Sequence, residues 1–501
     1  MNANRWARRF AAMLLGSVLL AGCGTTVVNP VTGREERTVM DEATEIAEGK
    51  KAHQDVLAEY GAYADPALQA YVNALGQKLA RQSHRANLPW TFTVLDSPEI
   101  NAFALPGGYV YVTRGIMAYL DSEAELAGVM GHEIGHVTAR HGAQRATRQQ
   151  DAGLGVLLAT VAGAVAEAAG VGGATDLASQ ISQGVAAGWL ATYSRDQELQ
   201  ADQLGAEYLA RNRYDPENMV DVIGVLKNQE RFAIDLAKAE GRAAPSGTNW
   251  LSSHPSNDQR LADIRRIAAG YKGDYADDGR ARYLQAIDGM TFGDSRAQGV
   301  VRGRQFFHED LGIALTAPAG WRIQNAQQAI TVANAAGDAG LVVQLLPPKA
   351  GTTHAEIIRN VVKPTQGRSE ARTIHGLAAT EFTGARLNAQ GRSQPVRVLL
   401  VSGPANRNYL LFRGARDATA LQRAAPALAE AESSFRPLGA AERAAARPWT
   451  LKTAPYPRGG FAELARSSPL PLQAEAQLRL MNSAYGGGPE PRTGQPVKVV
   501  R

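Results

Sequence analysis

Residues 132–136 read His-Glu-Ile-Gly-His, and this short run constrains the chain more than any other feature. On a helix, positions i and i+4 lie on one face, so His132 and His136 can direct both imidazoles at one metal ion. Glu133 stands beside the first histidine and can hold a water that the metal activates. The motif therefore predicts a helix that carries a catalytic metal centre, with Zn²⁺ as the metal.

The flanking sequence favours a helix over these residues. Ser122 stands three residues before Glu125, which is typical of a helix start. Apolar residues then recur at helical spacing at Leu126, Val129, Met130, Ile134 and Val137. We predict a helix from about Glu123 to about Gln144, with the two histidines facing inward. A chance pentapeptide on a solvated helix is the alternative, and a total of nine histidines in 501 residues argues against it.

A catalytic zinc site needs a third protein ligand and keeps a fourth position open. Position 142 is glycine, which excludes the long motif with a histidine ten residues after the first. His141 is expected to point away from the ligand face, as a surface residue or a support for a ligand. Glu198 and Asp202 are again i and i+4, on an expected second helix that ends near residues 214–216. One carboxylate can complete the coordination while the other orients a ligand histidine; an ordinary acidic helix face is the alternative.

The motifs at 132–136 and 198–202 together resemble those of the gluzincin metallopeptidases related to HtpX and the CAAX prenyl proteases. The likeness is strongest to the soluble periplasmic lipoprotein branch of that family. Three further segments share it: Asn-Pro-Val-Thr-Gly at 29–33, Asn-Ala-Phe-Ala-Leu-Pro-Gly-Gly at 101–108 and His-Pro-Ser-Asn-Asp-Gln-Arg at 254–260. The resemblance covers about residues 29–269. The combination is highly specific, whereas no single flanking motif would be.

The resemblance implies a role for each matching residue. His132, His136 and Glu198 would bind one zinc ion per chain, and Asp202 would support a ligand histidine from behind. Zinc lowers the pKa of a bound water to near neutrality and polarises the scissile carbonyl. Glu133 would act as the general base, taking the proton of that water and delivering it to the leaving amine.

Two more residues would lie near the metal by the same resemblance. These are His254 and Arg260. His254 would either stabilise the oxyanion or occupy the open metal position in a resting state, and the sequence does not choose between these roles. A capping or surface histidine before a proline is the alternative for His254.

Two short segments with period-two alternation, at 90–95 and 109–112, predict strands. Between them lie the candidate substrate-binding residues Asn101, Ala102 and Phe103. An exposed strand edge takes up an extended peptide through backbone hydrogen bonds, which would suit unfolded chains and give a loose sequence preference. A plain structural hairpin is the alternative, and both readings can hold together.

The N-terminus is typical of a lipoprotein signal. Arginines precede a short apolar run at 10–22, which is too short to span a bilayer and is followed by the chain's only cysteine. We predict a signal peptide over 1–22, lipidation at Cys23 and a linker over 23–40. Gly24 follows and not an aspartate, and the resemblance to bacterial lipoproteins then implies a periplasmic protein that is lipid-anchored to the outer membrane; a non-lipidated secreted protein is the alternative.

The length and patterning predict an α+β protein of three units. A mainly helical zincin-type peptidase domain with a small sheet would span 41–270, a mixed α+β accessory domain 299–440, and a small LysM-like or tail module 448–501. Inside the first, residues 152–191 are rich in alanine and glycine and predict a helical flap near the cleft, with a membrane-dipping hairpin as the alternative. The accessory domain resembles a PsbP/Mog-like sandwich, with strands expected at 313–316, 341–345, 396–401 and 409–412 and helices at 354–362 and 418–434.

We therefore expect a zinc-dependent endopeptidase that acts on unfolded or misfolded envelope polypeptides. The biological role rests on the resemblance alone. A chaperone-like outer-membrane assembly lipoprotein with a latent zinc site is the alternative, which the intact Glu133 disfavours. A cell-wall enzyme is a second alternative, suggested only by a tail that could bind peptidoglycan. The net charge is +5, and no clustered basic stripe indicates a nucleic-acid partner.

Overall fold

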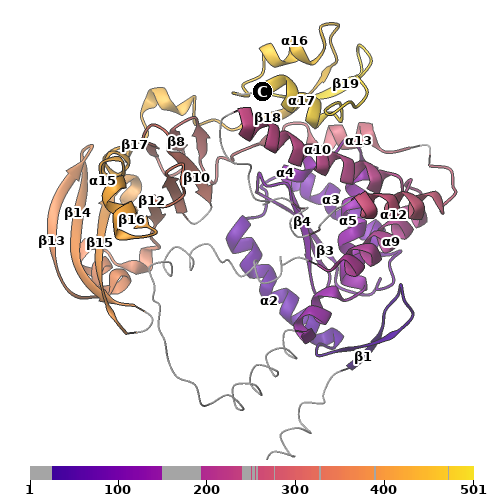
Figure 1. Ribbon diagram of the computed structural model, residues 1–501, viewed down its shortest axis with the longest axis horizontal. Helices are drawn as coiled ribbons and strands as arrows, with labels where there is room; N and C mark the ends of the chain where they lie inside the picture. The colour runs from indigo at the N-terminus through magenta and orange to yellow at the C-terminus, as the bar shows by residue number, and fades with distance from the viewer. Residues whose placement is uncertain are drawn as a thin grey trace, which may run out of the picture. The chain divides into compact units, whose positions relative to one another are not determined.

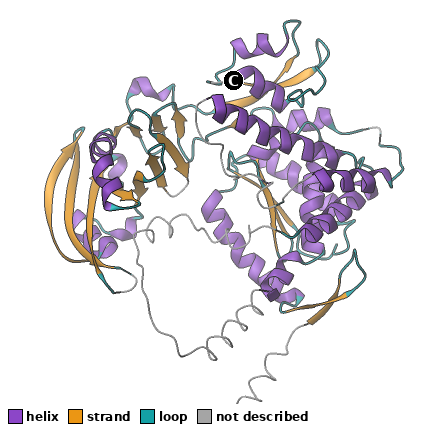
Figure 2. Ribbon diagram, in the orientation of Figure 1, coloured by secondary structure: helices purple, strands orange, loops and turns teal. Residues whose placement is uncertain are grey.

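The computed structural model describes residues 25–148, 193–239, 250, 254, 258–275, 277–326, 329–388, 391–471 and 473–501. They form two compact units. The first holds the described parts of Met1–Ala169, Val185–Asp288 and Lys452–Val500, and the second is mainly Gly289–Leu451. Both units contain helices and strands, so the protein is of the predicted α+β class (Figures 1 and 2). The predicted lipidation at Cys23 and the predicted flap at 152–191 lie outside the described residues.

The first unit begins with a hairpin and two helices. These are β1 (Thr25–Val28), β2 (Glu35–Thr38), α2 (Glu42–Tyr60) and α3 (Pro66–Ala80). The two strands pair antiparallel. The carboxylate of Asp41 accepts a hydrogen bond from the backbone N of Thr44 and starts α2. Asp65 does the same for α3, where a proline occupies the first turn, so both helix starts have local causes.

A three-stranded sheet follows, consisting of β3 (Thr91–Leu95), β4 (Ala102–Leu105) and β5 (Tyr109–Thr113) in the order β3-β5-β4. The two predicted strands are present, but they do not form a hairpin, because β3 pairs parallel with β5. β4 pairs antiparallel with β5. Its other edge pairs with no strand among the described residues, so β4 is an edge strand.

Helices make up most of the rest of this unit: α4 (Arg114–Met117), α5 (Glu123–Thr138), α9 (Arg195–Arg211), α10 (Asn218–Ala239), α12 (Asp258–Ala269) and α13 (Arg280–Ile287). None of the helices in the described part of the chain has the length and apolar character needed to span a bilayer. Ser122 caps α5 as predicted, since its Oγ accepts from the backbone N of Glu125 at 3.1 Å.

The prediction that this helix continues to about Gln144 is wrong. α5 ends at Thr138, and Arg140 adopts a φ of 57°, a left-handed conformation that a helix interior cannot contain. Residues 141–148 are helical again after this turn. The break changes the direction of the chain shortly after the second motif histidine.

The C-terminal residues belong to the same compact unit. They form β18 (Trp449–Pro455), which enters from the second unit, followed by α16 (Gly460–Arg466), α17 (Ala474–Met481) and β19 (Pro496–Val500). Lys498 is only 1% exposed. Its Nζ donates to the carbonyl of Leu120 and lies 3.0 Å from Oδ1 of Asp121. The last strand is therefore bonded to the turn that precedes α5, while peptidoglycan binding by residues 448–501 stays a prediction.

The second unit contains a seven-stranded antiparallel sheet in the order β10-β11-β12-β16-β15-β14-β13. The strands are β10 (Arg322–Ala326), β11 (Ala329–Ala333), β12 (Ala339–Leu345), β13 (Pro364–Ile374), β14 (Leu377–Leu387), β15 (Ser393–Ser402) and β16 (Asn408–Ala415). A smaller sheet, β17-β9-β8-β7, comprises β7 (Val300–Arg302), β8 (Gln305–His308), β9 (Ile313–Thr316) and β17 (Arg436–Pro437), and β6 (Thr291–Phe292) pairs with β18.

Helices cover both faces of the large sheet. α15 (Ala418–Ser433) shares one core with Leu399 and Val401 of β15. α14 (His354–Ile357) and the π-helical turn Ile358–Val362 share the opposite core with Val398 and Leu400. Because successive residues of a strand point to opposite faces, both faces of β15 are apolar.

Candidate metal centre

The helices α5 and α9 carry most of the candidate site, and glycines let them approach each other closely. A Cβ on Gly135 of α5 would lie 2.9 Å from the carbonyl oxygen of Ala201 on α9. A Cβ on Gly205 of α9 would lie 3.1 Å from the backbone N of His132. The glycine inside the His-Glu-Ile-Gly-His motif thus sets the distance between the helices that hold the histidines and the carboxylates.

We expect Gly135→Ala to lower the free energy of unfolding by about 1–3 kcal/mol, because the new methyl group would meet backbone atoms that cannot rotate away. Chemical denaturation of the metal-free protein measures this change. Gly224→Ala in α10 is the matched control, since a Cβ there meets nothing within 4 Å. The control should be neutral or stabilising by up to about 1 kcal/mol, and an equal loss in both variants would contradict the packing argument.

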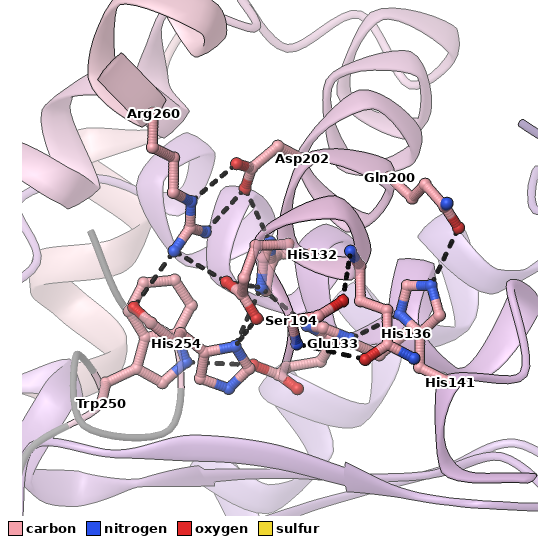
Figure 3. A network of polar contacts seen from close by, with 12 residues as sticks. His132, Glu133, His136, His141, Ser194, Gln200, Asp202, Trp250, His254 and Arg260 are labelled. Atoms are coloured by element: carbon pink, nitrogen blue, oxygen red, sulfur yellow. Dashed lines mark hydrogen bonds and ion pairs between the residues drawn. The ribbon is translucent and has the colours of Figure 1, made fainter. Parts of the chain in front are cut away.

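Four buried side chains lie close together: His132, His136, Glu198 and His254. Figure 3 labels the three histidines. Their potential ligand atoms all lie within 4.8 Å of one another. Nε2 of His132 lies 3.0 Å from Nε2 of His136 and 3.2 Å from Nδ1 of His254. Oε1 of Glu198 lies 3.0 Å from Nδ1 of His254 and 3.5 Å from Nε2 of His136. Tetrahedral ligands at about 2.0–2.2 Å from Zn²⁺ would stand about 3.3–3.6 Å apart, so this donor set fits zinc.

Asp202 lies behind His132. Its Oδ1 is 2.9 Å from Nδ1 of His132, which donates to the carboxylate and leaves the Nε2 lone pair for a metal. Nε and Nη2 of Arg260 donate to the two oxygens of the same carboxylate, each at 2.8 Å. Burial opposes ionisation, but the Arg260 charge and the hydrogen bonds from Arg260 and His132 together outweigh burial and hold the pKa of Asp202 below its ordinary value. Arg260 also lies 2.7 Å from Oε2 of Glu198, so it contacts both carboxylates.

His141 lies behind His136, so of the two expected roles the structure favours the support for a ligand and excludes the surface residue. It is fully buried, and its Nδ1 is 2.8 Å from Nδ1 of His136. The turn at Arg140 brings it there, which a continuous helix could not do. Burial lowers the pKa of His141 to about 4, so the ring is neutral at physiological pH. Its Nε2 lies 3.1 Å from Oε1 of Gln200.

Glu133 is completely buried beside the cluster. Its Oε1 accepts a hydrogen bond from Nε1 of Trp250 at 3.0 Å. Its Oε2 has no hydrogen-bond partner among the described residues. A buried carboxylate oxygen of this kind is costly unless a water or a proton meets it, which suits a general base.

Two aromatic residues frame the site, and sequence reasoning gave neither a role. The Trp250 ring stacks on His254 with centroids 4.6 Å apart, and the Tyr193 ring stacks on His136 at 3.8 Å. The spacing of Trp250 and His254 was a usable signal, because a turn of helix places i and i+4 together. The backbone N of His254 indeed donates to the carbonyl of Trp250 at 2.9 Å.

His254 is 1% exposed, which rules out a surface histidine. Burial disfavours its charged form, but the carboxylates of Glu198 and Glu133 outweigh burial and raise the pKa of His254. Its Nδ1 lies among the ligand atoms, and its Nε2 lies 3.5 Å from Oε1 of Glu133. Of the two roles left open by the sequence, this placement favours occupation of the metal position.

The candidate substrate residues lie at the start of β4. Ala102 and Phe103 are buried, and the Phe103 ring stacks on Tyr111 in the core with centroids 4.8 Å apart. The side chains of Ala102 and Phe103 are therefore part of the core, and what these two residues can offer a substrate is their backbone. A pocket beside this strand is lined by Ala104, Leu105, His136 and Tyr193, among others, so the edge and a metal-ligand candidate border the same hollow.

The part of the chain that contains this cluster resembles a known protein family. Residues 66–268 match the profile of Peptidase family M48. The beta-barrel assembly-enhancing protease of Yersinia pestis is 32% identical over 211 residues, which are 41% of this chain and 40% of that protein. The Escherichia coli K12 protein of the same name is 29% identical over 272 residues, 54% of this chain and 53% of that protein.

A mitochondrial protein is similar to this chain too. The mitochondrial metalloendopeptidase OMA1 of Schizosaccharomyces pombe is 30% identical over 217 residues, 42% of this chain and 58% of that protein. The chain thus spans about half the length of the relatives that it matches. Among solved structures, cyanobacterial PsbP from Synechocystis is 13% identical and covers 28% of this chain and 98% of its own, with a TM-score of 0.19. That score is too low to assign a fold to residues 299–440.

Proposed function

We propose, from the peptidase family M48 domain that residues 66–268 form, that this protein is a zinc-dependent endopeptidase. The observation that supports the proposal is the buried cluster of His132, His136, Glu198 and His254, which lies next to a carboxylate oxygen of Glu133 that has no hydrogen-bond partner in the described part of the chain. Three nitrogen donors and a carboxylate are the ligand chemistry of zinc. We assign one ion per chain.

Bound zinc would supply a Lewis acid that polarises the scissile carbonyl and acidifies a water. The residues of the chain do the remaining work. Glu133 accepts the proton from the attacking water at Oε2 and returns it to the leaving amine. Trp250 holds the other oxygen of Glu133 at 3.0 Å and keeps the carboxylate in place. Asp202 keeps His132 in the tautomer that can bind a metal, and Arg260 keeps Asp202 ionised.

The substrates that we propose are unfolded or damaged envelope proteins. The free edge of β4, beginning at Asn101, Ala102 and Phe103, would pair with an extended peptide through backbone hydrogen bonds. Backbone pairing recognises an extended chain rather than a side-chain sequence, and a folded protein offers few such segments. The pocket beside Leu105 and His136 would take one substrate side chain.

We place the protein in the periplasm, anchored to the outer membrane by a lipid on Cys23. The support is the N-terminal signal pattern of the sequence. Mass spectrometry of the membrane fraction tests this, with Cys23→Ser as the variant that should be released into the soluble periplasm.

The second candidate function is that of an assembly lipoprotein whose zinc site is inactive at rest. Only the position of His254 favours it. Because Nδ1 of His254 lies among the ligand atoms, this side chain would complete the coordination and exclude water at rest. We expect His254→Ala to raise the rate of cleavage several-fold while leaving one zinc per chain. Loss of activity with zinc retained would instead assign His254 to oxyanion stabilisation.

The deciding experiment uses the chain without residues 1–23. Bound zinc is measured by mass spectrometry, and the protein is incubated in parallel with an unfolded protein and with purified peptidoglycan. One zinc per chain with cleavage of the protein alone supports the proposal. Digestion of peptidoglycan would favour the cell-wall enzyme, and a chain without zinc would contradict the central assignment.

A further inference from the structure

We infer that Asn29, in the N-terminal hairpin, sets the tautomer of the metal-ligand candidate His136 through a directed hydrogen-bond relay formed by Asn29, Gln200, His141 and His136. Asn29 is then a positioning residue, far along the chain from the histidine that it serves. The inference deepens the proposed function and rests on it for the identity of the metal. The relay depends on which atoms can donate and which can accept.

The relay begins at a side chain whose orientation is fixed. Oδ1 of Asn29 accepts from the backbone N of Val31 at 2.9 Å and of Thr32 at 3.2 Å. Backbone N–H groups can only donate, so this end of the amide must be the oxygen. The Nδ2 group therefore points the other way, where it donates to Oε1 of Gln200 at 2.9 Å and to Oε1 of Glu36 at 3.0 Å. Asn29 is 2% exposed, so water does not replace these bonds.

The second step fixes His141. Oε1 of Gln200 already accepts from Asn29, and the same oxygen also faces Nε2 of His141 at 3.1 Å. A carbonyl oxygen can only accept, so Nε2 of His141 carries the proton. In the neutral imidazole, Nδ1 of His141 is then the acceptor.

The third step reaches the metal centre. Nδ1 of His141 lies 2.8 Å from Nδ1 of His136. With the first atom an acceptor, Nδ1 of His136 must donate, and Nε2 of His136 is left with its lone pair directed at the cluster. This is the only neutral tautomer in which Nε2 can bind a metal. Asp202 does the same for His132 directly, so each motif histidine has its own orienting partner.

The test is a substitution that should reverse donor and acceptor in each hydrogen bond of the relay. In Asn29→Asp, one oxygen keeps the turn at Val31 and Thr32, while the donor to Gln200 becomes an acceptor. The Gln200 amide should turn over, Nε2 of His141 should accept, and the proton should move to Nδ1 of His141. We expect zinc affinity, measured by chelator competition, to fall about 10–100-fold, the usual effect of losing a partner behind a ligand.

Two matched variants separate this from damage to the hairpin. Thr32→Ala removes an exposed bond in the same turn, from the backbone N of Arg34 to Oγ1 of Thr32, and should keep the wild-type affinity. Gln200→Glu keeps an acceptor oxygen towards both partners and should also bind zinc within a few-fold of wild type. Gln200→Leu removes the acceptor and should behave like Asn29→Asp.

A spectroscopic readout makes the result independent of activity. The ¹⁵N shifts of the histidine rings in the metal-free protein report which nitrogen of His141 carries the proton. A switch from Nε2 to Nδ1 in Asn29→Asp supports the relay, and an unchanged tautomer or unchanged zinc affinity overturns it. A wild-type protein that shows the expected tautomers but binds no zinc would contradict the proposed function and leave the relay standing.

Discussion

Glu133→Gln is expected to abolish peptide hydrolysis while leaving one zinc ion bound per chain. The amide has the same shape and can still accept from Nε1 of Trp250. It cannot take a proton from water at pH 7, so the step that Glu133 performs is lost. General-base catalysis contributes about 10²–10⁴-fold, and we expect the turnover rate to fall by at least that factor. Cleavage of an unfolded protein, followed alongside the zinc content, measures both effects.

The control for this variant is Glu217→Gln, which makes the same chemical change at an exposed site between α9 and α10. It should cleave like the wild type. A Glu133→Gln protein with retained cleavage would remove Glu133 from the mechanism. A variant that lost its zinc as well would show that the carboxylate is needed to build the site.

Asp202→Asn should weaken zinc binding and also destabilise the fold. The carboxylate pairs with Arg260, which is 7% exposed, and breaking such a buried pair costs about 3–5 kcal/mol. Because an amide can present a donor to Nδ1 of His132, the histidine also loses its fixed tautomer. Zinc affinity should fall about 10–100-fold. Denaturation of the metal-free protein isolates the stability change from the metal effect.

The loss of stability in Asp202→Asn should become smaller as the pH is lowered. The pKa of Asp202 is lowered in the folded protein, so the carboxylate stabilises the fold fully above the ordinary value of 3.8. The stabilisation disappears as the pH falls through the lowered folded value, and the stabilities of variant and wild type should converge there. Asp263→Asn is the control, since Asp263 pairs with the exposed Arg266 and its substitution should change the stability far less than Asp202→Asn does.

The sequence predicted the parts of the site that depend on short-range spacing. Two pairs at i and i+4 placed His132, His136, Glu198 and Asp202, because helical periodicity alone puts such residues on one face. The turn at Arg140 could not be predicted, since arginine has no preference for a positive φ and nothing nearby marks a helix end. The position of His141 depends on that turn, so the sequence left open whether His141 is a surface residue or a support for a ligand, and Gln200 was missed.

The second unit also contains strands that the local sequence predicts and strands that it does not. The strands β12, β15 and β16 were predicted because each contains a short run dominated by valine and leucine, and part of each run is buried. β13 was missed, since nearly all of its eleven residues are exposed and polar, and it therefore has no apolar alternation. The parallel pairing of β3 with β5 was also beyond the sequence, because pairing depends on contacts that no local pattern encodes.

The contacts of Lys498 with the start of the ligand helix can form only late in the synthesis of the polypeptide. The ligand helix α5 starts from a turn whose Asp121 and Leu120 are bonded to this lysine, in the last strand of the chain. While the polypeptide is being synthesised, the motif histidines emerge long before Lys498 does. At about 5–20 residues per second, the interval from His136 to Lys498 is about 20–70 s. For that time the start of the ligand helix lacks its contacts with Lys498, so this end of α5 can reach its final surroundings only after the residues up to 498 have been synthesised.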